Sequence, residues 1–313
     1  EHPVTEEITG VDLVEWQLRV ASGEPLPLAQ DELSIDGWAM EARLYAEDPA
    51  KGFLPSIGTL ELFQLSEADG GRIDTGVYEG GAVSPFYDPM IAKLIAYGDD
   101  REEARLTLSE MLEDSAVWPV KTNSAFLIKA LEHPDFVAGT VDTGLIGRDG
   151  DAMTAEPTPS AQALANAAMA LVPRSLQAGF RLNAPAAHSA PFLLDGKRVE
   201  VELHGPGAEE LAPAMLVAEQ GAVWQLSPWR AEGGAGGAAG DGAILSPMPG
   251  KIIAVEVATG DTVVKGQKLL TLEAMKMEHS LTAPFDGVVA ELNATAGAQV
   301  QVEALLVRIA AAE

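Results

Sequence analysis

An internal repeat near the end of the chain limits its possible folds more than any other feature of the sequence. A shift of 37 positions aligns two neighbouring segments so that turn-forming and apolar residues coincide: Pro247 with Pro284, Gly250 with Gly287, Gly260 with Gly297, Val263 with Val300, Leu269 with Leu306 and Leu272 with Ile309. Each copy has glycines where turns are needed and β-branched residues between them, as strands do. We therefore expect an all-β domain over residues 244–313, a small barrel-sandwich of two quasi-symmetric sheets.

The sequence TLEAMKMEHS, residues 271–280, lies between the two halves of this repeat. It places Lys276 between Met275 and Met277 at the predicted tip of a hairpin, from which a side chain projects far from the barrel. Such a lysine suits a carrier that presents a group to a partner, although an ordinary solvated lysine can occupy the same kind of position. The methionines are flexible and polarizable, so they can offer a partner a soft apolar surface around the lysine.

Residues 244–310 resemble the biotinyl carrier domains. The pentapeptide Glu-Ala-Met-Lys-Met matches their attachment motif, and the segments SPMPGKI and APFDGVV are similar to their two halves. The resemblance implies that a biotin protein ligase joins biotin to Lys276 through an amide, with Met275 and Met277 contacting the ligase or a partner active site. The lipoyl domain, which shares the symmetric fold, is the alternative. Lipoyl domains usually have an acidic residue before the lysine and a small residue after it.

Composition divides the rest of the chain into three parts, so we expect a multidomain protein. Residues 231–243 contain six glycines and no large apolar side chain, which predicts a flexible Ala/Gly linker. Residues 149–230 combine the helix-like SAQALANAAMALV with a hairpin signal at Asp195-Gly196, which predicts a helix beside a small antiparallel sheet or barrel. Residues 1–148 mix both patterns and predict an α+β unit.

Periodicity places the main elements of this first part. WAMEARLYAE alternates as a strand does, with Ala42 and Leu44 on one face and Glu41, Arg43 and Tyr45 on the other. Helices are predicted for VDLVEWQLRVASG, DDREEARLTLSEML and TNSAFLIKALEHP, because their apolar residues recur at helical spacing between capping or breaking residues.

Three stretches of residues 1–148 resemble the C-terminal part of biotin carboxylase: EHPVTEEITGVDLVEWQLRVASGEPL, AEDPAKGFLPSIGTL and YDPMIAKLI. That family has the ATP-grasp fold and makes carboxybiotin from biotin, bicarbonate and ATP with Mg2+. By resemblance, Glu1 is the general base for bicarbonate, and Arg43 contacts the biotin ureido oxygen and stabilises the enolate that forms there. Asp88 is expected near Arg43 as an orienting carboxylate. The residues alone favour another role for Arg43, a structural ion pair with Glu41 on the same face.

The order of these parts resembles the α subunits of acyl-CoA carboxylases. The resemblance implies that residues 149–230, with GFRLNAP, hold a carboxyltransferase β subunit in a hetero-oligomer. HPDFVAGTVDTGLI and MKMEHS favour 3-methylcrotonyl-CoA as the substrate, while propionyl-CoA, geranyl-CoA and a non-catalytic biotin carrier of a decarboxylase remain open. No glycine-rich phosphate loop, nucleotide lysine or acidic Mg2+ ligands precede Glu1, so we expect an N-terminally truncated subunit that is inactive alone.

Charge and composition restrict the possible partners. With 20 Lys+Arg against 47 Asp+Glu, the formal net charge is −27, which disfavours binding to nucleic acid or to an anionic membrane. The chain has no cysteine, so thiolate chemistry and thiolate metal sites are excluded. Neither a membrane-spanning apolar run nor an export signal is visible. We expect a cytoplasmic protein if it is bacterial and a mitochondrial matrix protein if it is eukaryotic.

Overall fold

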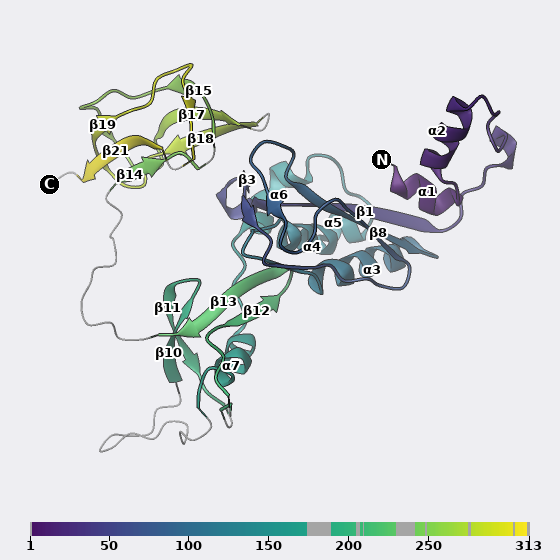
Figure 1. Cartoon of the computed structure of the whole chain (residues 1–313), viewed down its shortest axis with the longest axis horizontal. Helices are drawn as coiled ribbons and strands as arrows, with labels where there is room; N and C mark the ends of the chain where they lie inside the picture. Colours follow the sequence, from purple (N-terminus) through teal and green to yellow (C-terminus); the bar gives the residue numbers. More distant parts are fainter. Residues whose placement is uncertain are drawn as a thin grey trace. The chain divides into compact units, whose positions relative to one another are not determined.

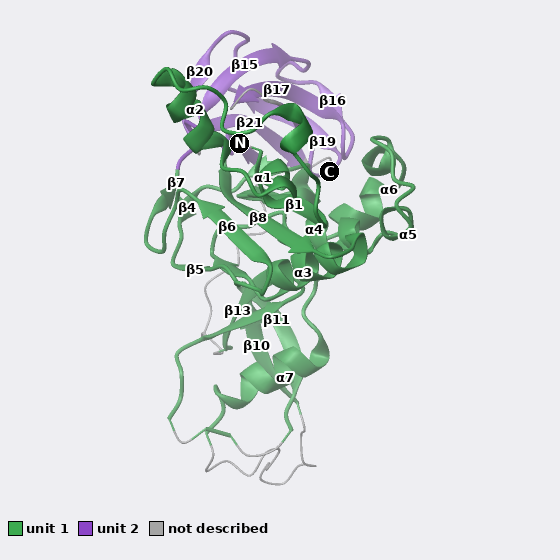
Figure 2. Cartoon of the chain, turned by 90° about the vertical axis from the view of Figure 1, so that its right-hand side faces the viewer, with its two compact units in different colours: residues 1–83, 89–230 green, residues 84–88, 231–313 purple. Residues whose placement is uncertain are grey.

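The computed structural model describes residues 2–173, 189–204, 207–208, 210–229, 242–247, 249–274, 277–302 and 304–311. The chain forms two compact units (Figure 2). Unit 1 consists of residues 1–83 and 89–230, and unit 2 of residues 84–88 and 231–313. The predicted fold class is confirmed, because unit 1 combines helices with antiparallel sheets and unit 2 has only strands among its described elements.

The elements of unit 1 are short and numerous (Figure 1). They are α1 (Pro3–Thr9), α2 (Leu13–Ala21), η1 (Gln30–Glu32), β1 (Trp38–Tyr45), β2 (Glu47–Asp48), η2 (Pro49–Lys51), β3 (Leu54–Pro55), β4 (Gly58–Thr59), β5 (Leu62–Gln64), β6 (Gly71–Thr75), β7 (Ala82–Val83), β8 (Met90–Gly98), α3 (Arg101–Glu113), β9 (Ala116–Trp118), α4 (Ser124–Glu132), α5 (Pro134–Val137), α6 (Leu145–Thr154), α7 (Ala161–Met169), β10 (Ser189–Leu194), β11 (Lys197–Glu202), β12 (Met215–Glu219) and β13 (Ala222–Pro228).

A three-stranded antiparallel sheet in the order β1-β8-β6 organises the first part of unit 1. Helix α3 packs along β1 and β8, and its N-cap Asp100 accepts a hydrogen bond from the Glu103 amide, as the capping signal predicts. The predicted alternation of β1 is confirmed, since Ala42 and Leu44 are buried in the core beneath α3. Their neighbours Glu41, Arg43 and Tyr45 therefore belong to the other face of the sheet.

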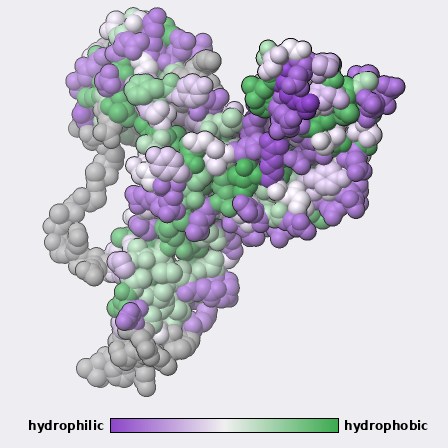
Figure 3. Space-filling model, turned by 45° about the vertical axis from the view of Figure 1, so that its right-hand side comes forward, coloured by the Kyte–Doolittle hydropathy of each residue, from purple (hydrophilic) through white to green (hydrophobic). Residues whose placement is uncertain are grey.

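Helix α2 forms within the predicted segment, but its apolar side chains are exposed instead of being packed against a core. It begins at Leu13 after the N-cap Asp12, whose side chain accepts from the Glu15 amide. None of its residues is buried, and Val14 and Leu18 are 54% and 66% exposed. Hydrophobic and hydrophilic surface lie side by side on unit 1 in the view of Figure 3. An apolar helical stripe of this kind is usually covered by a partner.

The middle segment of unit 1 is a four-stranded antiparallel sheet in the order β11-β10-β13-β12, with α7 packed on it. Phe192, Trp224 and Leu226 lie in the core between the sheet and the helix. The predicted turn at Asp195-Gly196 is confirmed: both residues have positive φ, as a two-residue type I′ hairpin requires. The GFRLN sequence lies outside the described residues.

Unit 2 confirms the two-sheet barrel predicted from the repeat. Its strands are β14 (Ala243–Leu245), β15 (Gly250–Val255), β16 (Thr262–Val263), β17 (Lys268–Ala274), β18 (Met277–Thr282), β19 (Gly287–Leu292), β20 (Gln299–Val300) and β21 (Leu305–Ala311). One sheet has the order β14-β21-β19-β16 and the other β18-β17-β15-β20. A shift of 37 positions aligns β15, β16 and β17 with β19, β20 and β21. Each of these strands is thereby aligned with a strand of the other sheet.

Equivalent glycines allow the close backbone approaches of this barrel. A Cβ atom at Gly250 would lie 2.7 Å from the carbonyl oxygen of Glu273, and one at Gly287 would overlap the carbonyl oxygen of Ala310. These two pairs are again 37 positions apart, so each half of the repeat needs a glycine at the same position to avoid a clash with the backbone. The predicted linker ends at residue 243, but Ala243 already begins β14; residues 230–241 lie outside the described residues.

Candidate functional sites

Lys276, the predicted attachment residue, lies in the sequence between two paired strands. Strands β17 and β18 are antiparallel, and the last pair in their register is Ala274 with Met277. Met275 and Lys276 are thus the two residues that connect the paired ends. Both lie outside the described residues, as does the side chain of Met277. Their assigned roles stay predictions, while the two strands that lead to them are fixed by the barrel.

The base of this hairpin is mostly apolar. Leu270 and Leu272 of β17 are fully buried, and Leu272 pairs with His279 of β18. His279 is only 7% exposed, and its Nε2 atom has no hydrogen-bond partner. Burial lowers the pKa of His279, because the apolar surroundings disfavour the charged imidazolium. A neutral imidazole therefore forms part of the packing beneath the hairpin.

Arg43 lies on the polar face of β1 and forms an ion pair within the strand. Its Nε atom donates to Oε1 of Glu41 at 3.0 Å, and this contact raises the pKa of Arg43. The Glu41 side chain is 15% exposed, whereas that of Arg43 is 54% exposed. The predicted alternative, a same-face pair with Glu41, is therefore present. One edge of the guanidinium is held by a carboxylate, and more than half of the side chain remains accessible.

The sheet register adds charged neighbours that the sequence did not reveal. Lys93 of β8 lies directly opposite Arg43, and Asp74 of β6 lies opposite Lys93. Within the described part of the chain no ion pair is formed by Lys93, whose side chain adds a second positive charge to this row. Only the register between strands far apart in sequence could have identified it.

Ion pairs from Arg72 of β6 connect helix α1 to the same sheet. The guanidinium contacts Oε2 of Glu6 at 2.9 Å and Oε1 of Glu7 at 3.3 Å, and it also pairs with Asp74. Asp74 and then Glu6 raise the pKa of Arg72. Glu1, the predicted general base, precedes this helix and lies outside the described residues. Its role stays a prediction.

Asp88 is not the residue that the sheet places beside Arg43. It precedes β8 by two positions, whereas Lys93 is the Cα partner of Arg43. Met90, at the start of β8, is three residues from Lys93, about 10 Å along a strand. Asp88 also falls in the segment 84–88, which belongs to unit 2. Its predicted orienting role is not tested by these observations and stays a prediction.

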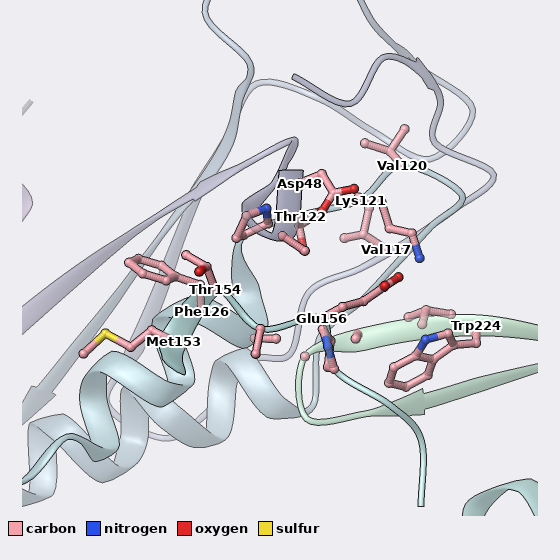
Figure 4. Close-up of a pocket in the computed structure, with 18 residues that line it drawn as sticks. Asp48, Val117, Val120, Lys121, Thr122, Phe126, Met153, Thr154, Glu156 and Trp224 are labelled. Atoms are coloured by element: carbon pink, nitrogen blue, oxygen red, sulfur yellow. The ribbon is translucent and has the colours of Figure 1, made fainter. Parts of the chain in front are cut away.

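A separate small pocket, with a volume of about 60 Å³, lies within unit 1 between α4, α6 and the β12–β13 hairpin. Figure 4 shows Phe126 and Met153 at one end, Trp224 at the other, and Lys121 between them. Neither Arg43 nor Asp88 lines this pocket. The described residues contain no group of three or more His, Asp or Glu that could hold a metal ion. No helix among them is long and apolar enough to cross a membrane.

Comparison with known families identifies the modules around these sites. Residues 41–148, which include Arg43, match the biotin carboxylase C-terminal domain, and residues 242–309 match the family described as biotin-requiring enzyme. Residues 1–29 match the ATP binding domain of the carbamoyl-phosphate synthase L chain. The chain thus combines a segment similar to biotin carboxylase with a segment similar to biotin-requiring enzymes.

Individual relatives include acyl-CoA carboxylase α subunits. The chain is 35% identical to the mitochondrial methylcrotonoyl-CoA carboxylase subunit alpha of Dictyostelium discoideum, covering 93% of this chain and 51% of the relative. It is 34% identical to the propionyl-CoA carboxylase alpha chain of Ruegeria pomeroyi, covering 97% and 56%. Rhizobium etli pyruvate carboxylase is a structural neighbour, with a TM-score of 0.50, 27% identity and coverage of 54% and 18%. The predicted similarity is confirmed, and the chain spans about half the length of these curated relatives.

Proposed function

We propose that this chain is the biotin-carrying portion of an acyl-CoA carboxylase α subunit. In this proposal the α subunit carboxylates biotin with ATP, Mg2+ and bicarbonate, and the carrier delivers carboxybiotin to a carboxyltransferase β subunit. The observation that carries the proposal is the β17–β18 hairpin of a symmetric barrel: its paired strands end at Ala274 and Met277, and Met275 and Lys276 stand between them in the sequence. Biotin on Lys276 would remove its charge and create a long arm.

The residues of unit 1 would act on the biotin ring. The Arg43 guanidinium donates toward the ureido oxygen and stabilises the negative charge that develops when the ring nitrogen loses its proton. Glu41 keeps the guanidinium oriented through the 3.0 Å contact, which leaves the rest of the fork for biotin. The exposed apolar stripe of α2 offers a packing surface for an ATP-binding segment.

The middle segment would hold the β subunit, and the substrate would be an acyl-CoA. The sheet of the middle segment, β10–β13, lies in the sequence between the carboxylase and carrier parts of the chain. Methylcrotonoyl-CoA carboxylase subunits support 3-methylcrotonyl-CoA as the favoured substrate, and the propionyl-CoA carboxylase relative supports propionyl-CoA as the alternative. A non-catalytic carrier is less consistent with the biotin carboxylase match over residues 41–148.

Biotin attachment is the direct test of this function. The 313-residue chain is expressed with a biotin protein ligase, and intact mass and peptide mass spectrometry locate the modification. We expect one biotin, on the peptide that contains Lys276, and none in the Lys276→Arg variant, which keeps the charge but cannot form the amide. Lys265→Arg, at an exposed turn of the same barrel, should label normally. A folded wild-type chain that accepts lipoate and refuses biotin would overturn the carrier assignment and the carboxylase function built on it.

A further inference from the structure

Asn123 contacts the strand that carries Arg43 through three hydrogen bonds, although it lies about 80 residues further along the chain. Its Nδ2 atom donates to the carbonyl oxygen of Arg43 at 3.1 Å, and its Oδ1 atom accepts from the amide of Tyr45 at 2.9 Å. Its own backbone amide donates to the carbonyl oxygen of Tyr45 at 3.2 Å. With only 6% of its surface exposed, Asn123 is one of the few buried polar residues of unit 1.

These bonds occur where β1 has the least support from its neighbours. Strand β1 is at one end of the order β1-β8-β6, so one of its edges has no strand partner in this sheet. The ladder to β8 is also irregular here: Leu44 pairs with Ala92 and Tyr45 with Met90, which leaves Ile91 without a partner on β1. Arg43 and Tyr45 are two positions apart, so their backbone groups point to the same edge. Asn123 therefore replaces a missing strand beside Arg43.

The local position of Asn123 suggests a different use for its side chain. It is the N-cap residue of α4, a position where asparagine normally accepts a hydrogen bond from the first turn. Here its side chain makes no capping bond. The side-chain amide is directed to β1 instead, and a cap that typically contributes about 1 kcal/mol to a helix is absent. If the role of Asn123 were to cap α4, its side chain would accept a hydrogen bond from the first turn of the helix.

The two bonds from the side chain also require an amide in particular. The Tyr45 amide is a donor and can face only the oxygen of Asn123, while the Arg43 carbonyl is an acceptor and can face only its nitrogen. Aspartate keeps the acceptor but sets a carboxylate against a carbonyl. Alanine removes both bonds and leaves two part-buried backbone groups without these partners, which is costly.

The segment around Asn123 is fixed from its other side by the middle sheet. The β12–β13 turn places Gly221 against Ser124 and Ile128 of α4, so closely that a Cβ atom there would lie 2.7 Å from the Ser124 hydroxyl oxygen. The neighbouring turn brings the Asp195 carboxylate to 3.6 Å from the Lys121 ammonium. Two hairpin turns thus hold the short connection that contains Asn123, and this limits how far the residue can move away from β1.

We propose that Asn123 is a positioning residue for Arg43: it completes the free edge of β1 and so fixes the backbone from which the guanidinium reaches biotin. The inference rests on the proposed role of Arg43 in biotin carboxylation. Small displacements of a positioned group lower catalytic rates strongly, by up to about a hundredfold for a shift near 1 Å. Asn123 itself touches neither biotin nor ATP in this proposal.

Amide hydrogen exchange tests the positioning directly in the 313-residue chain, without any activity. In Asn123→Ala the Tyr45 amide loses its acceptor, so its exchange should become about tenfold faster or more, while amides in the centre of α3 stay protected. Asn123→Asp keeps the acceptor and should leave the Tyr45 amide protected. Asn166→Ala, at an exposed site on α7, is the matched control and should change neither. Unchanged exchange at Tyr45 in a folded Asn123→Ala variant would contradict the proposal.

Activity then connects the position to the reaction, in an α subunit that includes its ATP-binding segment and with free biotin as substrate. We expect Asn123→Ala and Asn123→Asp to lower kcat/KM for biotin about tenfold with little change in the KM for ATP. A uniform loss for both substrates, or none, would reduce Asn123 to a structural residue. Arg43→Ala separates the two roles: if it has no effect, the proposed role of Arg43 fails and that of Asn123 with it, and if it alone lowers the rate, only the role of Asn123 fails.

Discussion

The hairpin that leads to Lys276 is held by residues close to it in sequence, whereas the strand that carries Arg43 is held by residues far from it. Strands β17 and β18 pair with each other and continue to Ala274 and Met277 on either side of the two connecting residues. The bonds from Asn123 to Arg43 and Tyr45 instead span 80 and 78 positions. The candidate carrier site is a local property of one motif, while the candidate site around Arg43 is assembled from distant segments.

This difference fits what each site must do. In the proposed function a carrier presents Lys276 to a ligase and to two active sites, and a self-contained hairpin suits this task. An arginine that stabilises developing charge must be held in one orientation relative to other groups. Contacts such as those of Asn123 and Glu41 provide that orientation, and their loss should damage one function without the other.

The largest expected effect separates the two sites completely. In an α subunit that includes its ATP-binding segment, Arg43→Ala should lower the rate of biotin carboxylation about a hundredfold, since the loss of one such donor costs about 3 kcal/mol of transition-state stabilisation. ATP affinity and the labelling of Lys276 by a biotin ligase should stay unchanged. Steady-state rates with free biotin and mass spectrometry of the same preparation provide both measurements. An unchanged carboxylation rate would leave Arg43 as a structural partner of Glu41.

Local features of the structure could be predicted well from the sequence. The repeat predicted the two sheets of unit 2 because the turn glycines and buried leucines recur with the strands themselves. Alternation likewise predicted which face of β1 carries Arg43, a capping aspartate predicted the start of α3, and Pro134 predicted the end of α4. Alternation and helix ends depend on neighbours within a few residues, and the repeat marks its turns at a fixed spacing of 37 positions.

The candidate site of unit 1 could be predicted only in part, because its geometry depends on register and tertiary contacts. Glu41 was foreseen, since period-two spacing places it beside Arg43. Lys93 and Asn123 were missed: the position of Lys93 depends on how β8 pairs with β1, and Asn123 has the sequence context of an ordinary helix cap. The exposure of α2 was also unexpected, because periodicity identifies an apolar stripe but does not show what covers it.

A second prediction tests whether the two halves of the barrel are equivalent. Gly250→Ala and Gly287→Ala should each lower the free energy of unfolding of unit 2 by about 1–3 kcal/mol, because the new methyl group meets the carbonyl oxygen of Glu273 or Ala310. Native-state hydrogen exchange of the buried strands of unit 2 measures this quantity separately from unit 1.

Two other glycines of the same barrel provide the control. Gly260 and Gly297 are also 37 positions apart, and both have positive φ, but a Cβ atom at either would have no neighbour within 4 Å. Alanine there should cost only the backbone strain, about 1 kcal/mol. A large loss at Gly287 with none at Gly250 would show that the sequence repeat does not correspond to equal steric constraints.

The smallest expected effect concerns His279, the buried imidazole beneath the lysine hairpin. Its pKa is lowered in the folded state by burial, so below the unfolded value of about 6.5 the unfolded chain binds more protons than the folded one. The free energy of unfolding of unit 2 should therefore fall as pH decreases from 7.5 to 5.5, by at most about 1.4 kcal/mol per pH unit from this one group.

Substitution of the imidazole isolates this contribution from the carboxylates, which titrate at lower pH. His279→Leu keeps an apolar side chain of similar size in the buried position and removes the Nε2 atom that has no hydrogen-bond partner. Its unit 2 should lose less stability than the wild type between pH 7.5 and 5.5, as measured by hydrogen exchange corrected for the intrinsic rate at each pH. His204→Leu, whose side chain is 62% exposed, should retain the wild-type dependence. If His279→Leu shows the same pH dependence as the wild type, the imidazole is not part of the packing that supports the lysine hairpin, and other groups must account for any acid sensitivity of the carrier.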